Sequence, residues 1–324
     1  MVRSLTEVIA RRRLAVYRRL LLVAVPAALA GCQDGGEMLA PESTGGATAI
    51  PAAAPEGLLA AASLDRIAFA TSNDIYGMSP TGAGQSRMTS YSGEEIYPIW
   101  SPDHGRIAFN RIRDGHFELY LMKADGTNGH WALAKDASVT VGRASWAPDG
   151  KSLVAQIYLT SAYVGKIDLA SGQWTHLAPL GRYGLQGTYP MYSKDGTWIY
   201  YVAPGGKELR RFQPNGSDVL VTTIEGSLSE LALSPDGKKI AFVLNVLGNT
   251  DVCVLDLATG DFKRVIKNSH QDVDPAWSPN GARLAFASDR SGKFQIYVAD
   301  SDDGGNLVKL TARTNGAYDP SWYR

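Results

Sequence analysis

The sequence predicts an all-β fold: a six-bladed β-propeller whose blades are four-stranded antiparallel sheets. Three observations lead to this prediction. One phrase recurs at a nearly constant spacing, each repeat holds four short strand patterns, and the two ends of the repeat region complement one another. The copies of the phrase are IWSPDHGRIAF, SWAPDGKSLVA, MYSKDGTWIYY, ALSPDGKKIAF and AWSPNGARLAF.

An aromatic residue, or its substitute, stands just before the turn in each copy. These anchor positions lie 41 to 46 residues apart, at Trp100, Trp146, Tyr192, Leu233, Trp277 and Trp322. A period of this length indicates a propeller or a solenoid. The best copy holds the strand patterns DPAWS, RLAFAS, FQIYVAD and LVKLT, separated by turn compositions. No helical periodicity intervenes, so the strands should be antiparallel and each repeat should form a propeller blade.

The repeated phrase itself predicts a tight chain reversal. Pro279 presets φ at the second turn position, and Gly281 tolerates a positive φ at the fourth. Trp277 is large enough to fill the wedge between adjacent sheets. On the next strand Leu284 and Phe286 alternate with small residues, so one face should be bulky and the other should allow close approach.

The two ends of the repeat region predict a closed ring. LDRIAFATSNDIYGMSPTGAGQSRMTS supplies the last three strands of a unit, and the C-terminal AYDPSWYR supplies the first strand alone. The C-terminal strand should therefore pair beside residues 66–70 and complete a sixth blade. Such a ring has no free sheet edge, whereas a solenoid would need capping repeats, which the sequence does not show.

The repeat resembles PxWSPDGxxIAFxSxRxGxxxIYxxDxDG, the motif of the TolB-type, WD-like β-propellers. The match is closest over residues 98–126 and 275–304, and the resemblance covers about residues 64–324. It implies a six-bladed propeller in the bacterial envelope. TolB itself carries an additional α/β domain before its propeller and is not a lipoprotein, so the N-terminal region of this chain differs.

The N-terminal region has the pattern of an export signal. Basic residues up to Arg19 precede the short apolar run LLLVAVPAALA, which is too short to span a bilayer. The following Leu29-Ala30-Gly31-Cys32 resembles a bacterial lipobox, which implies cleavage before Cys32 and lipidation of its thiol; ordinary cleavage after Ala30 is the alternative. We expect residues 1–31 to be a lipoprotein signal peptide, 32–62 a flexible Ala/Gly/Pro-rich tether, and 63–324 the propeller. Gln33 after the cysteine favours the outer membrane, facing the periplasm.

Charge argues against a nucleic-acid partner. Residues 1–31 hold six arginines and one glutamate, which leaves 26 basic and 31 acidic residues in the mature chain. A mildly acidic protein is not suited to neutralise a phosphate backbone. We expect a monomer that contacts the membrane through its N-terminal lipid.

The sequence predicts no cofactor, no metal site and no catalytic residue. The five histidines fall in different repeats without metal-ligand spacing. The acidic stretch DSDDGG, residues 300–305, lacks the glutamate that an EF-hand needs and is expected to be a hairpin turn. Cys253 lies in the strand pattern DVCVLDL and is expected to be a buried small hydrophobic residue.

What remains for function is the face of the ring. Strand alternation places the loops between blades, and those between the second and third strands, on one side of the ring. Three residues before each anchor stands a position that varies among bulky polar types. We predict that these six positions form a ring near the channel mouth, or alternatively are solvated strand ends. The candidate binding rim adds two tyrosines to them and comprises Tyr97, Arg143, Tyr183, Tyr189, Glu230, Asp274, Tyr318 and Asp319.

The resulting hypothesis is a lipid-anchored, extracytoplasmic propeller that binds or scaffolds envelope proteins. Two alternatives stay open. One is a receptor for glycans or peptidoglycan fragments that uses Tyr97, Tyr183, Tyr189 and Tyr318 as stacking platforms. The other is a lyase or hydrolase with a site at the channel mouth built from Arg143, Glu230, Asp274 and His270.

Overall fold

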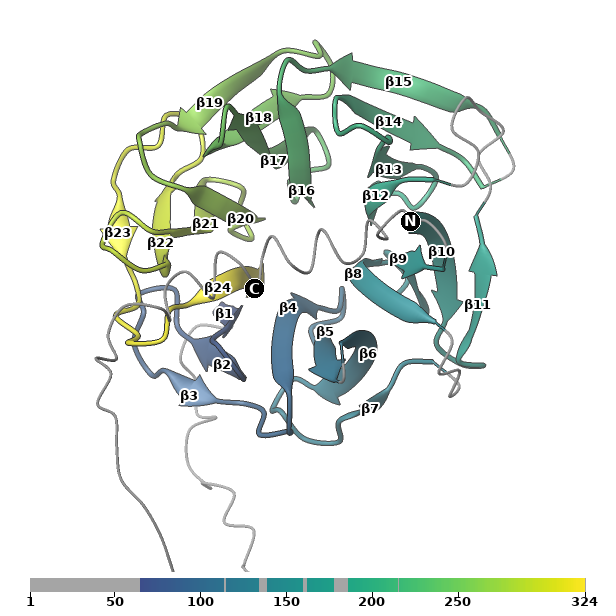
Figure 1. Cartoon of the computed structure of the whole chain (residues 1–324), viewed down its shortest axis with the longest axis horizontal. Helices are drawn as coiled ribbons and strands as arrows, with labels where there is room; N and C mark the ends of the chain where they lie inside the picture. Colours follow the sequence, from purple (N-terminus) through teal and green to yellow (C-terminus); the bar gives the residue numbers. More distant parts are fainter. Residues whose placement is uncertain are drawn as a thin grey trace, which may run out of the picture. The chain divides into compact units, whose positions relative to one another are not determined.

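A ring of six antiparallel sheets forms the fold, as the repeats predict (Figure 1). The computed structural model describes residues 65–113, 115–133, 139–159, 162–177, 186–214 and 216–323. Within these ranges the chain forms 24 strands and no helix, so no segment there is a helix long and apolar enough to cross a membrane.

Each sheet is a blade of four strands in the order in which the chain supplies them, apart from the first. The first three blades contain β24 (Tyr318–Tyr323), β1 (Arg66–Ala70), β2 (Ile75–Met78) and β3 (Ser86–Arg87); β4 (Glu94–Trp100), β5 (Arg106–Arg113), β6 (His116–Lys123) and β7 (His130–Trp131); and β8 (Thr140–Trp146), β9 (Ser152–Tyr158), β10 (Ala162–Asp168) and β11 (Gln173–His176). The last three contain β12 (Thr188–Tyr192), β13 (Ile199–Val202), β14 (Glu208–Phe212) and β15 (Asp218–Thr223); β16 (Ser227–Leu233), β17 (Lys239–Val246), β18 (Asn249–Asp256) and β19 (Phe262–Ile266); and β20 (Asp272–Trp277), β21 (Arg283–Ser288), β22 (Gln295–Asp300) and β23 (Val308–Lys309).

The C-terminal strand closes the ring. β24 pairs antiparallel with β1, and the register places Tyr323 opposite Arg66 and Trp322 opposite Ile67. The first blade is therefore completed by the last strand of the chain, which confirms the prediction from the two ends of the repeat region. Closure leaves no inner strand without a partner.

The core lies between the blades. On β21, Leu284 and Phe286 pack with Val252 of the fifth blade, while the small Ala285 between them packs toward Phe69 of the first blade. All of these side chains are buried. β21 thus contributes a bulky face to one interface and a small face to the next, as the alternation predicts, whereas β13 presents large side chains on both faces, with Tyr200 on one and Tyr201 on the other.

The turn of the repeated phrase has a common hydrogen-bond pattern. The N–H of Gly281 donates to the carbonyl of Ser278 at 2.8 Å, and Gly281 has φ 73°. The Ser278 hydroxyl accepts the N–H of Arg283 at 2.9 Å, and serines 101, 193 and 234 do the same in their turns. In the first copy His104 occupies the glycine position with φ 60°, because the phrase there contains one extra residue.

The anchor tryptophans also make a bond that the sequence did not suggest. In three of the four anchor tryptophans the indole N–H donates to the main-chain carbonyl of the residue that precedes the anchor of the preceding blade, whereas the indole nitrogen of Trp322 is buried without a hydrogen-bond partner. The bonds run from Trp100 to Ser321 (3.2 Å), from Trp146 to Ile99 (3.2 Å) and from Trp277 to Ala232 (3.0 Å). Tryptophan at the wedge therefore contributes both volume and a polar link between blades, whereas Leu233 carries no donor.

Replacing Trp277 by Phe tests this link. The substitution keeps an aromatic ring but leaves the carbonyl of Ala232 without its donor, and we expect the free energy of unfolding to fall by about 1–3 kcal/mol. Denaturant unfolding measures the change, with Trp174→Phe on the outer strand β11 as the control. If Trp277→Phe and Trp174→Phe lower the free energy of unfolding equally, the volume of Trp277 matters for stability and its hydrogen bond does not.

Candidate functional site

The six variable positions meet at the axis of the propeller. Each lies on the first, innermost strand of its blade: Tyr97 on β4, Arg143 on β8, Tyr189 on β12, Glu230 on β16, Asp274 on β20 and Asp319 on β24. We call these six residues the axial ring. The structure brings these six residues together, because Arg143 contacts each of the other five.

A β-bulge brings each of these side chains to the axis. The register of all six innermost strands shifts at this level, for example between Val273 and Ala276 of β20. Five of the six residues have positive φ, between 50° and 57°: Tyr97, Tyr189, Glu230, Asp274 and Asp319. For non-glycine residues this left-handed conformation costs about 1–2 kcal/mol each. Backbone strain is thus concentrated at one level of the channel, where bulges re-aim side chains.

Carboxylates of the ring satisfy the amides that the bulges release. The N–H of Asp274 donates to Glu230 Oε2 at 2.8 Å, and the N–H of Asp319 donates to Asp274 Oδ2 at 3.4 Å. The N–H of Tyr97 donates in turn to Asp319 Oδ2 at 3.4 Å. Each acid therefore caps the backbone of the next blade, which explains why acidic residues occupy three successive positions.

Arg143 crosses the axis and joins the other five members. Its guanidinium forms an ion pair with Asp274, whose blade lies opposite in the ring (Figure 1). Nη2 also lies 3.0 Å from Asp319 Oδ1 and 3.8 Å from Glu230 Oε1. The same group stacks over the Tyr97 ring at 3.9 Å and lies 5.9 Å from the Tyr189 ring centre.

The electrostatics of the axial ring keep Arg143 charged. Burial acts to lower the pKa of Arg143, but Asp274, Tyr97, Glu230 and Asp319 together raise it above its usual range. The three carboxylates are only 5–6% exposed, and Arg143 is 21% exposed. A single guanidinium therefore stabilises three buried acids.

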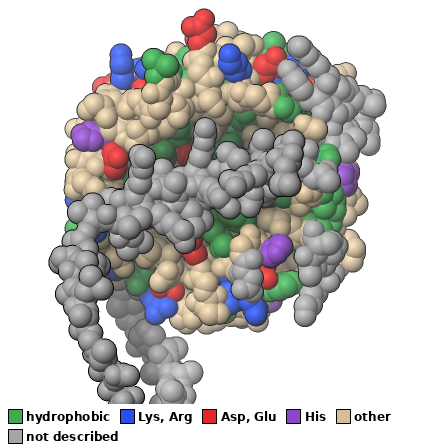
Figure 2. Space-filling model, viewed as in Figure 1, with side chains coloured by type: hydrophobic (Ala, Val, Ile, Leu, Met, Phe, Trp, Pro, Cys, Tyr) green, Lys and Arg blue, Asp and Glu red, His purple; other side chains and the backbone are tan. Residues whose placement is uncertain are grey.

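A cavity of about 550 Å³ lies beside the axial ring. Its wall continues along the innermost strands past the anchors Trp100, Trp146 and Trp277 to the turns, where Pro102 and Pro235 line it. In the view of Figure 2, hydrophobic side chains are visible toward the inner part of the face, among side chains of other types. The axial ring is the floor of this cavity.

The cavity opens toward the face of the Ser-Pro-Asp-Gly turns. We expected the six residues near a mouth framed by the loops between blades. They lie within the innermost strands, from the second residue of β12 and β24 to the fourth residue of β4, β8 and β16, and the cavity extends from them toward the turns. The bulge turns each of these side chains toward the axis.

The remaining members of the candidate rim lie elsewhere. Tyr318 is only 8% exposed and packs against Phe294 at 5.4 Å, so it offers no open face for stacking. Burial, followed by the charge of Asp319, raises the pKa of Tyr318 to about 12. Tyr183 and Cys32 fall outside the described residues.

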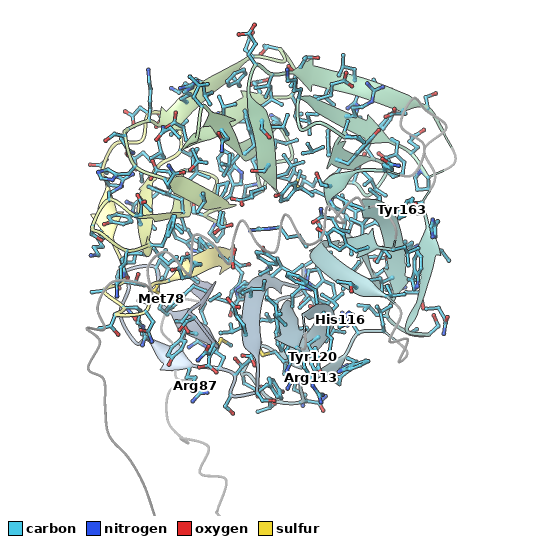
Figure 3. The ribbon with its side chains drawn as sticks, in the orientation of Figure 1. Met78, Arg87, Arg113, His116, Tyr120 and Tyr163 are labelled. Atoms are coloured by element: carbon cyan, nitrogen blue, oxygen red, sulfur yellow. The ribbon has the colours of Figure 1, made fainter. Side chains whose placement is uncertain are left out.

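Other candidate groups for chemistry lie apart from the cavity floor. His116 is in the second blade (Figure 3), and His270 lies 3.6 Å from Asp289 at a loop between blades. In the part of the chain that the structure describes, no three His, Cys, Asp or Glu side chains form a metal-binding group.

Cys253 is buried, as predicted, and burial raises its pKa to about 12. Residues 300–305 form the predicted hairpin turn, closed by the Gly304 N–H to the Asp300 carbonyl at 3.0 Å.

Replacing Arg143 by Met tests the role of the guanidinium. Methionine retains much of the length but leaves three buried carboxylates without their cation, so we expect a loss of about 3–5 kcal/mol of stability at pH 7. The loss should shrink near pH 4, because protonation of the carboxylates removes their repulsion. Denaturant unfolding at the two pH values measures this.

Arg143→Lys is the matched variant, because it keeps the charge but loses the planar contact with Tyr97. We expect it to fall between the wild type and Arg143→Met at pH 7. A loss for Arg143→Met that is the same at both pH values would show that packing, not charge, is what Arg143 supplies.

Comparison with known proteins supports the resemblance seen in the repeats. The sequence profile of the TolB beta propeller domain matches residues 189–324. The Tol-Pal system protein TolB of Francisella tularensis is 32% identical over 139 residues, which are 41% of this chain and 32% of that protein. Dipeptidyl-peptidase 5 of Porphyromonas endodontalis is 24% identical over 237 residues, which are 66% of this chain and 32% of that protein. The chain thus spans about a third of each of these two relatives.

The fold also matches a solved TolB structure. The structure of TolB from Acinetobacter baumannii superposes with a TM-score of 0.68 and 22% identity, over 79% of this chain and 66% of that one. At this identity the likeness concerns the fold alone. Together with the closed ring of six blades, it confirms the six-bladed β-propeller fold, and residues 189–324 are similar to the TolB beta propeller domain.

Proposed function

We propose that the chain is a lipid-anchored binding module of the bacterial cell envelope, which recognises a protein partner through the cavity above the axial ring. The observation that carries the proposal is the concentration of strain and charge at one level of the channel. Five left-handed residues and a crossing arginine maintain a fixed floor under an open cavity of about 550 Å³. Such pre-organisation lowers the cost of ordering a site on binding.

The wall and the floor of the cavity suit a protein segment. Its turn side is lined by prolines, such as Pro102 and Pro235, and its wall by the edges of the anchor aromatics. Rigid apolar walls with polar groups at the base are typical of recognition pockets. Similarity to TolB, named as a protein of the Tol-Pal system, supports an envelope role.

The two alternative functions receive less support. The Tyr97 ring carries the Arg143 guanidinium on one face, and Tyr318 is buried, which counts against a glycan platform built on these two tyrosines. The suggested enzyme site needs His270 beside the acids, and His270 pairs with Asp289 instead of lining the cavity.

The membrane anchor is part of the proposal. Lipidation of Cys32 and a tether over residues 33–62 would let the propeller sample positions about 30 Å from the outer membrane, on its periplasmic side. The propeller would act as a monomer on this tether.

Replacing Cys32 by Ala tests the anchor. Without the thiol no lipid can be attached, and we expect the protein to move from the membrane fraction to the soluble periplasmic fraction. Fractionation of cells with immunodetection measures the distribution. Continued retention of Cys32→Ala in the membrane fraction would show that another feature holds the protein there.

Replacing Pro235 by Arg tests the cavity as the binding site. Pro235 stands at the second position of the Ser234–Gly237 turn, whose Gly237 N–H donates to Ser234 at 2.9 Å, and it lines the cavity mouth. A long charged side chain there should obstruct the mouth and weaken partner binding by about tenfold or more. Crosslinking in the native envelope identifies the partner, and titration of the purified pair gives the affinity.

Pro204→Arg is the matched control. Pro204 holds the same second position in the turn closed by Gly206 N–H to Ala203 at 3.0 Å, but that turn joins β13 to β14 on the opposite face. The proposal expects this variant to bind as the wild type does. Equal affinity of the wild type and Pro235→Arg would place the partner elsewhere on the molecule.

A further inference from the structure

The hairpin between β17 and β18 ends in an unusual two-residue turn. Ladder pairing continues to Val246 opposite Asn249, so only Leu247 and Gly248 form the turn. Both have positive φ, 52° and 94° respectively. This is the signature of a type I′ turn, which strongly prefers Asn-Gly. Leucine at the first position is therefore unfavourable for the backbone.

Leu247 is also fully exposed to solvent. Among the described residues, the other large hydrophobic side chains classed as exposed are no more than 47% exposed. In the described ranges, the other non-glycine residues with positive φ outside the axial ring are polar: His104, Asn128 and Asn306. A single exposed leucine is ordinary, but full exposure combined with a strained backbone is not, because neither folding nor solubility favours it.

Neighbouring side chains hold the turn rigidly. The Gly248 N–H donates to Asn245 Oδ1 at 3.0 Å, and the Gln271 side chain donates to the Gly248 carbonyl at 3.0 Å. The Gln271 amide oxygen in turn accepts the Thr250 hydroxyl at 2.8 Å. Asn249 Nδ2 completes the support through the carbonyl of Asn268 at 3.0 Å. The leucine is thus presented on a fixed support and not on a loose loop.

We propose that Leu247 is the anchor of a second protein-binding surface, on the face of the loops between blades. The leucine would insert into an apolar pocket of a partner protein, and the surrounding amides would bond to the polar rim of that pocket. A lipid surface fits less well, because Leu247 stands alone among polar side chains such as Asn249 and Gln271, and one leucine contributes only about 1.5–3 kcal/mol on burial, too little to hold a protein at a membrane. This surface lies on the face opposite the opening of the cavity, so the inference goes beyond the proposed function.

The decisive variant is Leu247→Asn, which gives the turn the sequence that it prefers. It should raise the melting temperature by about 2–4 °C, because backbone strain is relieved. It should also weaken binding of the partner by about tenfold to a hundredfold, because one buried leucine side chain is lost. Loss of binding with a gain in stability cannot come from unfolding.

The partner is found with a photoreactive p-benzoylphenylalanine at position 247 of the full-length, membrane-associated protein. The same residue at Thr259, exposed in the β18–β19 turn on the other face, is the control. We expect a protein adduct specific to position 247. That protein, once purified, is titrated against the wild type, Leu247→Asn, Pro235→Arg and Pro204→Arg.

Each result bears on one surface. Adducts to lipid alone, no specific adduct at position 247, or equal affinity of the wild type and Leu247→Asn would overturn the inference. If Leu247→Asn lowers the affinity for this protein and Pro235→Arg does not, the result supports the second surface. The cavity proposal is then tested separately, with the partner that binds the cavity. Weakening by Pro235→Arg alone contradicts this inference and not the cavity proposal.

Discussion

Closure of the ring by the last strand is the constraint on which the rest of the structure depends. Pairing of β24 with β1 places Asp319 and Trp322 at the axis beside residues from the other five blades. The axial ring needs Asp319 to cap the Tyr97 amide, and the wedge between the first two blades needs the Ser321 carbonyl to accept the Trp100 indole N–H. The two ends of the repeat region thus complete the site together.

The axial ring has a structural role that also shapes its chemistry. A bulge turns a side chain toward the axis but frees a backbone N–H, and an acid in the preceding blade accepts that group. The same acid-to-amide bond in successive blades places three carboxylates at the axis, and a single guanidinium stabilises them. The residue types at the axial-ring position therefore vary among repeats partly for structural reasons. The cavity above the axial ring is the surface that remains for recognition.

The sequence predicted what local rules and periodicity determine. The 41–46-residue spacing, the Pro279–Gly281 turn and the complementary ends were sufficient for blade number and closure. The bulges at the axial ring were not predicted, because a bulge breaks the alternation from which strand faces are inferred. The Arg143 contacts were missed because they join blades across the axis. Leu247 had a visible signal, leucine in a two-residue turn, but its exposure depends on neighbours that only the fold supplies.

The central claim is that the axial ring is one network held across the propeller by Arg143. A double-mutant cycle of Arg143→Met and Asp274→Asn, followed by denaturant unfolding at pH 7, tests it most directly. The account predicts that the two changes are strongly non-additive, with a coupling of about 1–3 kcal/mol, because Asp274 needs the cation only while it is charged. Additivity to within about 0.3–0.5 kcal/mol would contradict the account, because it would show that the two residues act independently across the axis.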